Sequence, residues 1–166
     1  NIITIIKNIG SEKGIPLLHK MKDDPDKRVR MEIIRSLENI KTKQSIELLK
    51  KFINDADSQI RDTALITIAL IDLPESFEIL RDLLENRPRL HQQALTAMRY
   101  LNRKECGEYL MTLYGDPESL KESGYADADI KTLRHALQSV LEKKFGKNFG
   151  KNTELPIKNP HSAFKK

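Results

Sequence analysis

Residues 24–37 read DPDKRVRMEIIRSL, and residues 55–68 repeat the same pattern as DADSQIRDTALITI. The paired aspartates, the arginine (Arg30, then Arg61) and four apolar positions all return 31 residues later. A third, weaker copy follows 30 residues further on, and a looser fourth copy comes only after an insertion. Repetition at a fixed spacing of this length is typical of stacked repeat arrays. We therefore predict that one structural unit recurs along the chain.

The apolar residues of these segments have the spacing of one helix face. Val29, Ile33, Ile34 and Leu37 stand at i, i+4, i+5 and i+8, which is a helical and not a strand period. A second, shorter apolar pattern lies between the segments, so each unit is predicted to hold two helices. The first helices are predicted at residues 14–23, 45–54, 75–85 and 104–114, and the second helices at 26–40, 57–71, 88–101 and 127–144.

The start of the chain fits the same register. Apolar residues between positions 2 and 15 align, again at a spacing of 31, with those between positions 33 and 46. Residues 1–9 are therefore predicted to be the second helix of an earlier, truncated repeat. Because position 1 is Asn1 and not Met, we infer a fragment or a processed chain; a short cap helix, complete in itself, is the alternative.

The repeated motif resembles a known family. Asp-Pro-Asp-x-x-Val-Arg-x-x-Ile-Ile-x-x-Leu at a spacing near 31 residues is similar to the short HEAT-like repeats of bacterial proteins, the group named after phycobilisome lyases. The resemblance covers roughly residues 1–144 and implies an all-α fold, a right-handed α-solenoid of stacked helix pairs that presents an extended surface to partners. Residues 145–166 are then expected to form a separate basic C-terminal tail.

The net charge of +5 is concentrated at the C-terminus. Seven lysines and two glutamates lie between residues 142 and 166, and the rest of the chain is neutral. A basic sequence suggests nucleic-acid binding, but that inference weakens when the charge is confined to a tail. No apolar run reaches the length of about 18 residues that a membrane span needs.

Residues for catalysis or for metal binding are scarce. One cysteine, Cys106, provides neither a disulfide nor a cysteine-based zinc site, and the four histidines are too scattered for a pair on one helix turn. His91 and His135 are expected at the surface, and Cys106 is expected to be a small buried residue. We predict no catalytic residue, no metal, no cofactor and no enzymatic activity.

Residues 146–153, which read GKNFGKNT, superficially suggest a phosphate loop. The spacing between the glycines is too short, an asparagine follows the lysine, and no strand precedes the run. Gly146 is instead predicted to end the last helix in the left-handed conformation.

Arg30 and Arg61 are predicted to have a structural role. In repeats similar to these, the arginine pairs with a turn aspartate of its own or of the neighbouring unit. This would involve Asp24 or Asp26 for the first turn and Asp55 or Asp57 for the second.

A partner-binding face is predicted on the solvent side of the second helices. Counting two and six positions on from the core residue of each helix gives an apolar centre with a polar rim, the usual anatomy of a protein interface. The predicted contact residues are Arg35, Ile66, Leu70, Thr96, Arg99, Tyr100 and Gln138. The alternative is that neighbouring helices cover Ile66 and Leu70, since the helix that carries them is almost wholly apolar.

Two further segments are candidates for contact. The insertion at residues 115–126 is expected either to touch a partner or to cap the stack, with Leu120 and Tyr125 as its apolar contacts. The tail at residues 146–166 is expected to be disordered, to pack along the array or to touch an anionic surface.

The sequence therefore predicts a non-catalytic scaffold that binds another protein through the second-helix face and the 115–126 loop. The alternative is a nucleic-acid-associated or anionic-surface-associated HEAT protein that uses its tail. A third reading, an accessory subunit of a tetrapyrrole enzyme, rests on family analogy alone. The expected compartment is the cytoplasm or, if a signal preceded Asn1, the periplasm.

Overall fold

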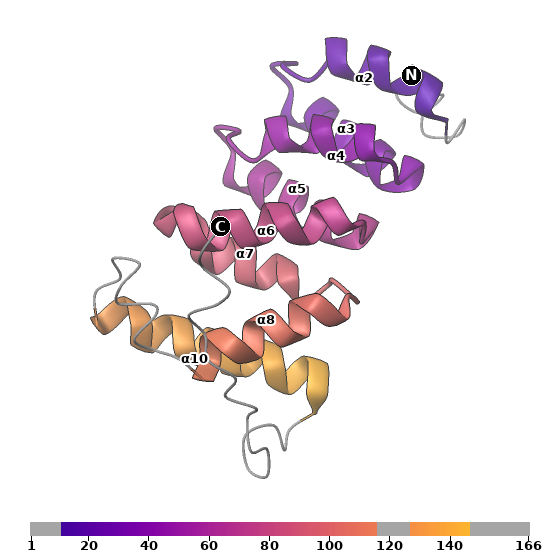
Figure 1. Cartoon of the computed structure of the whole chain (residues 1–166). Coiled ribbons are helices and arrows are strands. Elements are labelled where there is room, and N and C mark those ends of the chain that lie inside the picture. Colours follow the sequence, from indigo (N-terminus) through magenta and orange to yellow (C-terminus); the bar gives the residue numbers. More distant parts are fainter. Residues whose placement is uncertain (1–10, 116–126, 147–166) are drawn as a thin grey trace. The chain divides into compact units, whose positions relative to one another are not determined.

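The computed structural model describes residues 11–115 and 127–146, and these residues form helices and short connections (Figure 1). The chain is all-α, with the paired helices of a repeat solenoid. Its internal contacts divide it into two compact units, Asn1–Arg81 and Asp82–Lys166. In the described residues, no helix is both long enough and apolar enough to cross a membrane.

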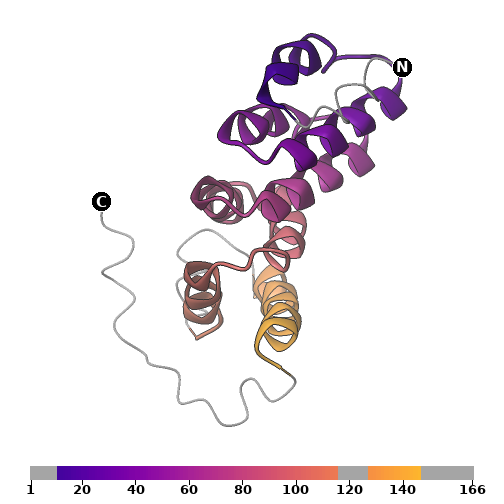
Figure 2. The same cartoon turned by 90° about the vertical axis from the view of Figure 1, so that its right-hand side faces the viewer.

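The first unit contains the two strongest copies of the repeat. After the 3-10 turn Glu12–Gly14 come α2 (Ile15–Lys20), α3 (Lys27–Ile40), α4 (Lys43–Phe52) and α5 (Ser58–Ile71), and α6 (Pro74–Asn86) crosses the boundary between the units. The second helices α3 and α5 pack side by side, and α4 packs against both of them. Figure 2 shows α2 and α4 in one layer and α3 and α5 in the other.

Equivalent residues begin and end the second helices of this unit. Asp26 and Asp57 are the N-caps of α3 and α5, and their side chains accept hydrogen bonds from backbone amides of the first turn. Lys41 and Asp72 end the same two helices in the left-handed conformation, with φ of 54° and 56°. Both pairs are 31 residues apart, so the repeat in sequence is also a repeat in backbone geometry.

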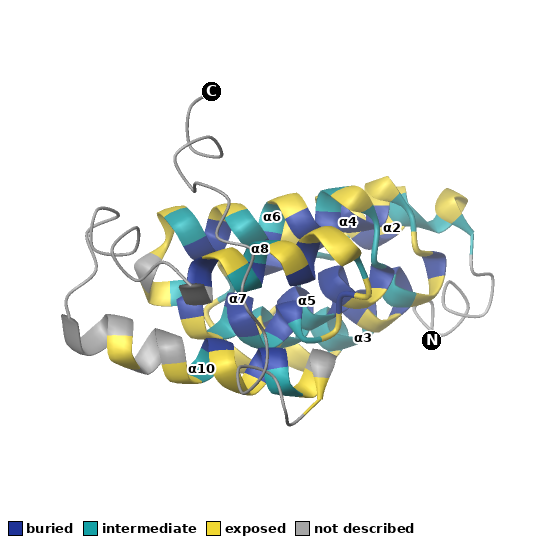
Figure 3. Ribbon diagram, turned by 60° about the horizontal axis from the view of Figure 1, so that its bottom comes forward, coloured by how far each residue is buried: buried dark blue, intermediate teal, exposed yellow. Residues whose placement is uncertain are grey.

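The core of the first unit consists of the repeated apolar positions. The buried side chains come from both layers: Leu18, Ile33, Ile34, Leu37, Ile46, Leu49, Phe52, Ala64, Leu65 and Ile68. Figure 3 shows buried and exposed residues interspersed along the helices, as expected where one side of a helix faces the core. Burying one face of each helix against its neighbours stabilises helices that would be marginal in isolation.

The second unit contains the 3-10 turn Pro88–Leu90, α7 (His91–Met98), α8 (Lys104–Gly115) and α10 (Asp127–Phe145), with α10 packed against both α7 and α8. Gly146 ends α10 with φ of 93°, and its amide donates to the Glu142 carbonyl at 2.8 Å. This confirms the predicted left-handed stop.

The helix boundaries agree with the predicted ones to within two residues except for α2, which ends at Lys20 and not at residue 23, and for the second helix of the third repeat. The helix predicted at 88–101 is shorter, because a 3-10 turn precedes α7 and the amides of Tyr100 and Leu101 bond three residues back, to Ala97 and Met98. Pro88 has no amide to donate and so favours such a tight start. The helix predicted for residues 1–9 lies outside the described residues.

Candidate partner-binding face

The repeated turns before α3 and α5 share one hydrogen-bond arrangement. Asp24 accepts from the amide of Asp26 at 2.8 Å, and Asp55 accepts from the amide of Asp57 at 2.9 Å. The arginine of each repeat then returns to its own turn. Arg30 donates from Nη1 to the Asp24 carbonyl at 2.8 Å, and Arg61 donates from Nη1 to the Asp55 carbonyl at 2.7 Å.

Arg30 also links one repeat to the next. Its Nε and Nη2 donate to the two carboxylate oxygens of Asp55 at 2.8 and 3.0 Å, and the two side chains are only 15% and 10% exposed. The hydrogen bond to Asp55 raises the pKa of Arg30. This confirms the structural pairing predicted for Arg30, and it selects the carboxylate of the neighbouring turn.

The pairing predicted for Arg61 is only partly formed. Arg61 makes the two carbonyl bonds to its own turn, to Asp55 and to Ala56, and forms no ion pair with any residue in the described part of the chain. The step of 25 residues that leads from Arg30 to Asp55 leads from Arg61 to Asn86, which has no charge. The loss of the turn acid in the third copy therefore explains the difference.

In the first unit, the predicted face comprises Arg35 on α3 and Ile66 and Leu70 on α5. Arg35 is exposed and pairs with Glu32 on its own helix. Ile66 is half-buried and Leu70 is 38% exposed, so within the described residues the neighbouring helices cover Ile66 in part and leave Leu70 exposed. An exposed leucine on a helix is unremarkable by itself, but here it lies at a repeated position.

In the second unit, the predicted face comprises Thr96, Arg99 and Tyr100 at the C-terminal end of α7, together with Gln138 on α10. Tyr100 is 39% exposed, Thr96 and Arg99 are half-buried, and Gln138 is exposed and donates to Glu142 at 3.0 Å. The position two or six residues after the core residue is thus at least partly exposed in every described second helix.

The prediction missed Lys143, which belongs to this face. Its ammonium lies 5.6 Å from the centroid of the Tyr100 ring, a cation–π distance. The sequence analysis placed Lys143 in the helix predicted at 127–144, which is α10, and counted its charge with the C-terminal segment, but did not include it in the face. No step of the repeat register leads to Lys143, because a residue seven positions after the core residue Ala136 would be expected on the core side of the helix.

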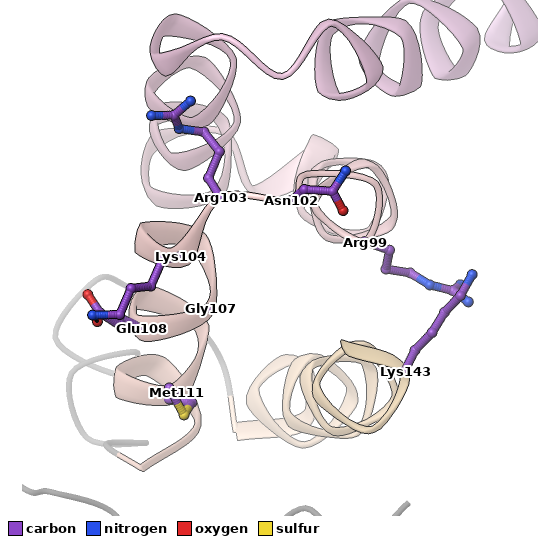
Figure 4. Close-up of a pocket in the computed structure, with 8 residues that line it drawn as sticks. All are labelled: Arg99, Asn102, Arg103, Lys104, Gly107, Glu108, Met111 and Lys143. Atoms are coloured by element: carbon purple, nitrogen blue, oxygen red, sulfur yellow. Dashed lines mark ion pairs between the residues drawn. The ribbon is translucent and has the colours of Figure 1, made fainter. Parts of the chain in front are cut away.

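A pocket of about 470 Å³ adjoins this face within the second unit (Figure 4). It lies between the end of α7, the first turns of α8 and the end of α10. The residues that line it are Arg99, Asn102, Arg103, Lys104, Gly107, Glu108, Met111 and Lys143. Of these, only Arg99 was predicted, because the prediction counted positions along single second helices and did not say which residues of other elements lie beside them.

Two of the basic residues of the pocket are paired and two are not. Lys104 pairs with Glu108 at 2.9 Å, and Arg103 pairs with Glu105 at 3.5 Å. Arg99 and Lys143 have no acidic partner in the described residues, and Arg99 Nε is buried without a hydrogen-bond acceptor. Figure 4 shows these two side chains extending toward one another from α7 and α10.

The histidines and the cysteine give a mixed outcome. Cys106 is buried, as predicted, whereas His91 is only 8% exposed, so its predicted surface position is wrong. His91 stands 31 residues after the buried Ile60 and begins α7, so the 3-10 turn places it, and not Leu90, at the buried position. His135 is exposed, as predicted. In the described residues no cluster of three or more His, Cys, Asp or Glu side chains could hold a metal ion.

The loop and tail predictions lie outside the described residues. Leu120 and Tyr125 fall in the segment 116–126, and all of the tail beyond Gly146 falls in 147–166. Their roles stay predictions.

Comparison with protein families identifies the type of repeat. HEAT repeats match residues 1–69 and, in a second register, residues 15–99, which together cover more than half of the chain. Comparison with curated proteins gives no match. The match does not separate the phycobilisome-lyase type from other HEAT repeats. The repeated turns, the paired helices and this match together show that the chain belongs to the HEAT-repeat family.

Proposed function

We propose that this chain is a non-catalytic scaffold that binds another protein through the exposed face of its second helices. HEAT repeats are generally protein-interaction scaffolds, which supports the coarse assignment. The finer assignment to one face is supported by a single observation. Leu70 and Tyr100, six positions after the core residues Ala64 and Ala94, are both exposed large hydrophobic residues.

The chemistry of the face suits a protein partner. In the first unit Leu70 and Ile66 on α5 offer apolar surface and Arg35 on α3 offers a guanidinium; in the second unit Tyr100 offers an aromatic ring and Arg99 a guanidinium. Aromatic and arginine side chains dominate the binding energy of many protein interfaces, while the polar rim excludes water. The two units each supply one part of the face, and the proposal requires only that a partner contacts both.

The test is affinity purification of the chain with the partner that it retains, followed by measurement of that complex. Leu70→Asp and Tyr100→Asp should each weaken the complex by about tenfold or more, because each places a charge on apolar contact surface. Helical circular dichroism and the melting temperature establish that each variant remains folded.

Leu17 provides a matched control. It lies on α2 in the other layer and is 41% exposed, slightly more than Leu70. Leu17→Asp therefore introduces the same charge at an equally exposed leucine and should leave the complex intact. If all three variants bound the partner like the unaltered chain, or if Leu17→Asp alone weakened it, the second-helix face would not be the binding surface.

A further inference from the structure

The basic pocket of the second unit is the feature that the scaffold assignment does not itself explain. Four cationic side chains and one carboxylate line it, and the two paired cations, Arg103 and Lys104, already have acidic partners at its α8 edge. The surplus charge is therefore on Arg99 and Lys143, which come from different helices and converge at the edge nearest Tyr100.

We propose that this pocket binds carboxylate side chains of an acidic segment of the partner protein, with Arg99 and Lys143 as the principal contacts. A guanidinium can bind a carboxylate with two parallel hydrogen bonds, and the ammonium adds a second point charge. The proposal rests on the proposed scaffold function and identifies the chemistry of what that scaffold binds.

The local electrostatic field already favours a carboxylate at this place. Glu105, in the first turn of α8, has a lowered pKa, chiefly because its own backbone amide donates to it and also because Arg103 is close. The positive end of a helix stabilises anions in this way within its first turn. A carboxylate in the pocket would lie near the same helix end, which Lys104 lines, and near Arg99 and Lys143, which have no acidic partner in the part of the chain that the structure describes.

An acidic peptide fits the pocket better than a nucleic acid does. Nucleic-acid binding uses a stripe of unpaired cations that follows several phosphates. Here Arg103 and Lys104 are paired with Glu105 and Glu108, so the pocket offers no continuous stripe of unpaired cations for a phosphate backbone to follow, whereas one or two carboxylates need only Arg99 and Lys143. The exposed ring of Tyr100 and the Met111 side chain add apolar surface, which suits a peptide that mixes carboxylates with apolar residues.

The acidic stretch 116–126 of the same chain is a poor occupant. It joins the C-terminal end of α8 to the N-terminal end of α10, whereas Arg99 and Lys143, the proposed contacts, lie before the start of α8 and near the C-terminal end of α10. At a rise of about 1.5 Å per residue, Gly115 lies roughly 16 Å along α8 from Lys104. Reaching the pocket and returning would take nearly the whole extended length of the stretch, about 36 Å.

The experiment measures binding of two fluorescein-labelled dodecapeptides to the full chain by fluorescence anisotropy. One peptide contains Glu, Asp and Leu, and the other has the same arrangement with Gln and Asn in place of the acids. We expect only the acidic peptide to bind. Arg99→Gln combined with Lys143→Gln should weaken that binding by about tenfold or more, and Lys143→Gln alone should weaken it less.

A control pair keeps the net charge equal. Arg87 and Lys131 are exposed and do not line the pocket, so Arg87→Gln combined with Lys131→Gln should change the affinity less than twofold. If both double variants lost the same affinity for the acidic peptide, the binding would be explained by general electrostatic attraction, and the proposal would be overturned. Neutralising Asp116, Glu118 and Glu122 should leave the affinity unchanged; a clear rise would instead make 116–126 the occupant.

Two further probes, a labelled single-stranded oligonucleotide and vesicles of anionic lipid, are tested for binding to the same chain and variants. Binding of either one that is tighter than that of the acidic peptide, and that is lost in the Arg99 and Lys143 variants, would overturn the peptide assignment. If the acidic peptide fails to bind while Leu70→Asp and Tyr100→Asp still abolish the natural complex, this inference fails and the scaffold proposal stands.

Discussion

At the scale of single residues, the repeated turn accounts for the recurrence of aspartate and arginine. One aspartate folds the turn by accepting the amide two residues on, the next caps the helix, and the arginine joins the turn carbonyls of its own repeat. Of the two repeated arginines, Arg30 also donates to a carboxylate, that of Asp55, whereas Arg61 has none among the residues that the structure describes. These residues are fixed by structure, and a partner-binding role is not needed to explain them.

Asp55→Asn should destabilise the chain by about 2 kcal/mol, because it leaves the largely buried guanidinium of Arg30 without its charged partner. Asparagine still accepts the amide bond of the turn, so the loss reports the ion pair. Asp24→Asn is the matched control: Asp24 makes the same turn bond, but Arg30 binds its carbonyl and not its carboxylate. Urea unfolding of both variants measures the difference, and equal losses would contradict the assignment.

The N-cap Asp26 should contribute to the dependence of stability on pH. Hydrogen bonds from the Arg28 side chain and amide lower its pKa from 3.8 to about 2. A carboxyl group whose folded pKa is depressed stabilises the fold above its unfolded pKa, and this stabilisation is lost as the pH falls from about 4 to 2. The stability difference between the unaltered chain and Asp26→Asn should therefore be present at pH 6 and shrink towards pH 2.

Asparagine is also a good N-cap, so Asp26→Asn removes the titration without removing the cap. Asp23→Asn, on an exposed neighbour that pairs with Lys22, is the control for removing one negative charge from this turn. A constant difference between Asp26→Asn and the unaltered chain from pH 6 to pH 2 would show that Asp26 does not titrate with folding.

At the scale of helices, periodicity and capping explain most of the boundaries. The apolar period locates α3, α4 and α5, and residues suited to capping precede each of them. Thr42 and Ser45 form a capping box at the start of α4, in which each side chain meets the backbone amide of the other. Helix α7 begins later than predicted because a 3-10 turn precedes it. The position of that turn depends on Pro88 and on whether Leu90 or His91 is the buried residue.

Thr42→Ala should destabilise the chain by about 1 kcal/mol, since it removes the acceptor for the Ser45 amide. Thr63→Ala is the control within α5, where the hydroxyl only bonds back to the Gln59 carbonyl. That change should be neutral or slightly stabilising, because alanine is the better helix former. Thermal unfolding followed by circular dichroism measures both; a larger loss for Thr63→Ala would contradict this view of the caps.

At the scale of the whole molecule, the chain consists of two compact units whose contacts are mostly internal. In repeat arrays stability is approximately a sum of repeat terms and nearest-neighbour terms, so a local loss spreads first to adjacent helices. The proposed binding face draws residues from both units, whereas the acidic-peptide pocket lies wholly in the second. Changes in the core of one unit are therefore expected to have local effects.

Ile68→Ala should destabilise the first unit by about 2–4 kcal/mol, because it leaves a cavity at a fully buried position. Amide hydrogen exchange should then accelerate in α3, α4 and α5 more than in α8 and α10. Leu110→Ala, at a fully buried position of the second unit, should give the reverse pattern. Uniform acceleration throughout the described helices in both variants would mean that the units unfold together.

Much of the binding face follows from the sequence once the repeat is recognised. A residue six positions after a core residue lies about 120° around the helix from it and so outside the centre of the core face, which is why Leu70 and Tyr100 could be predicted as exposed. Lys143 and the α8 side of the pocket could not, because spacing along one helix does not tell which residue of another helix will lie beside it.

The sequence by itself determined the repeat, the helical fold, the residues of the core and the solvent side of the second helices, because these depend on local periodicity and capping. The tertiary structure alone decided that Arg30 pairs with Asp55, that His91 is buried at the start of α7 and that Lys143 lies over Tyr100. These outcomes depend on how separate helices pack and on the residue at which a helix begins, which sets the residues that face the core. Such contacts join residues far apart in the chain, and no periodicity encodes them.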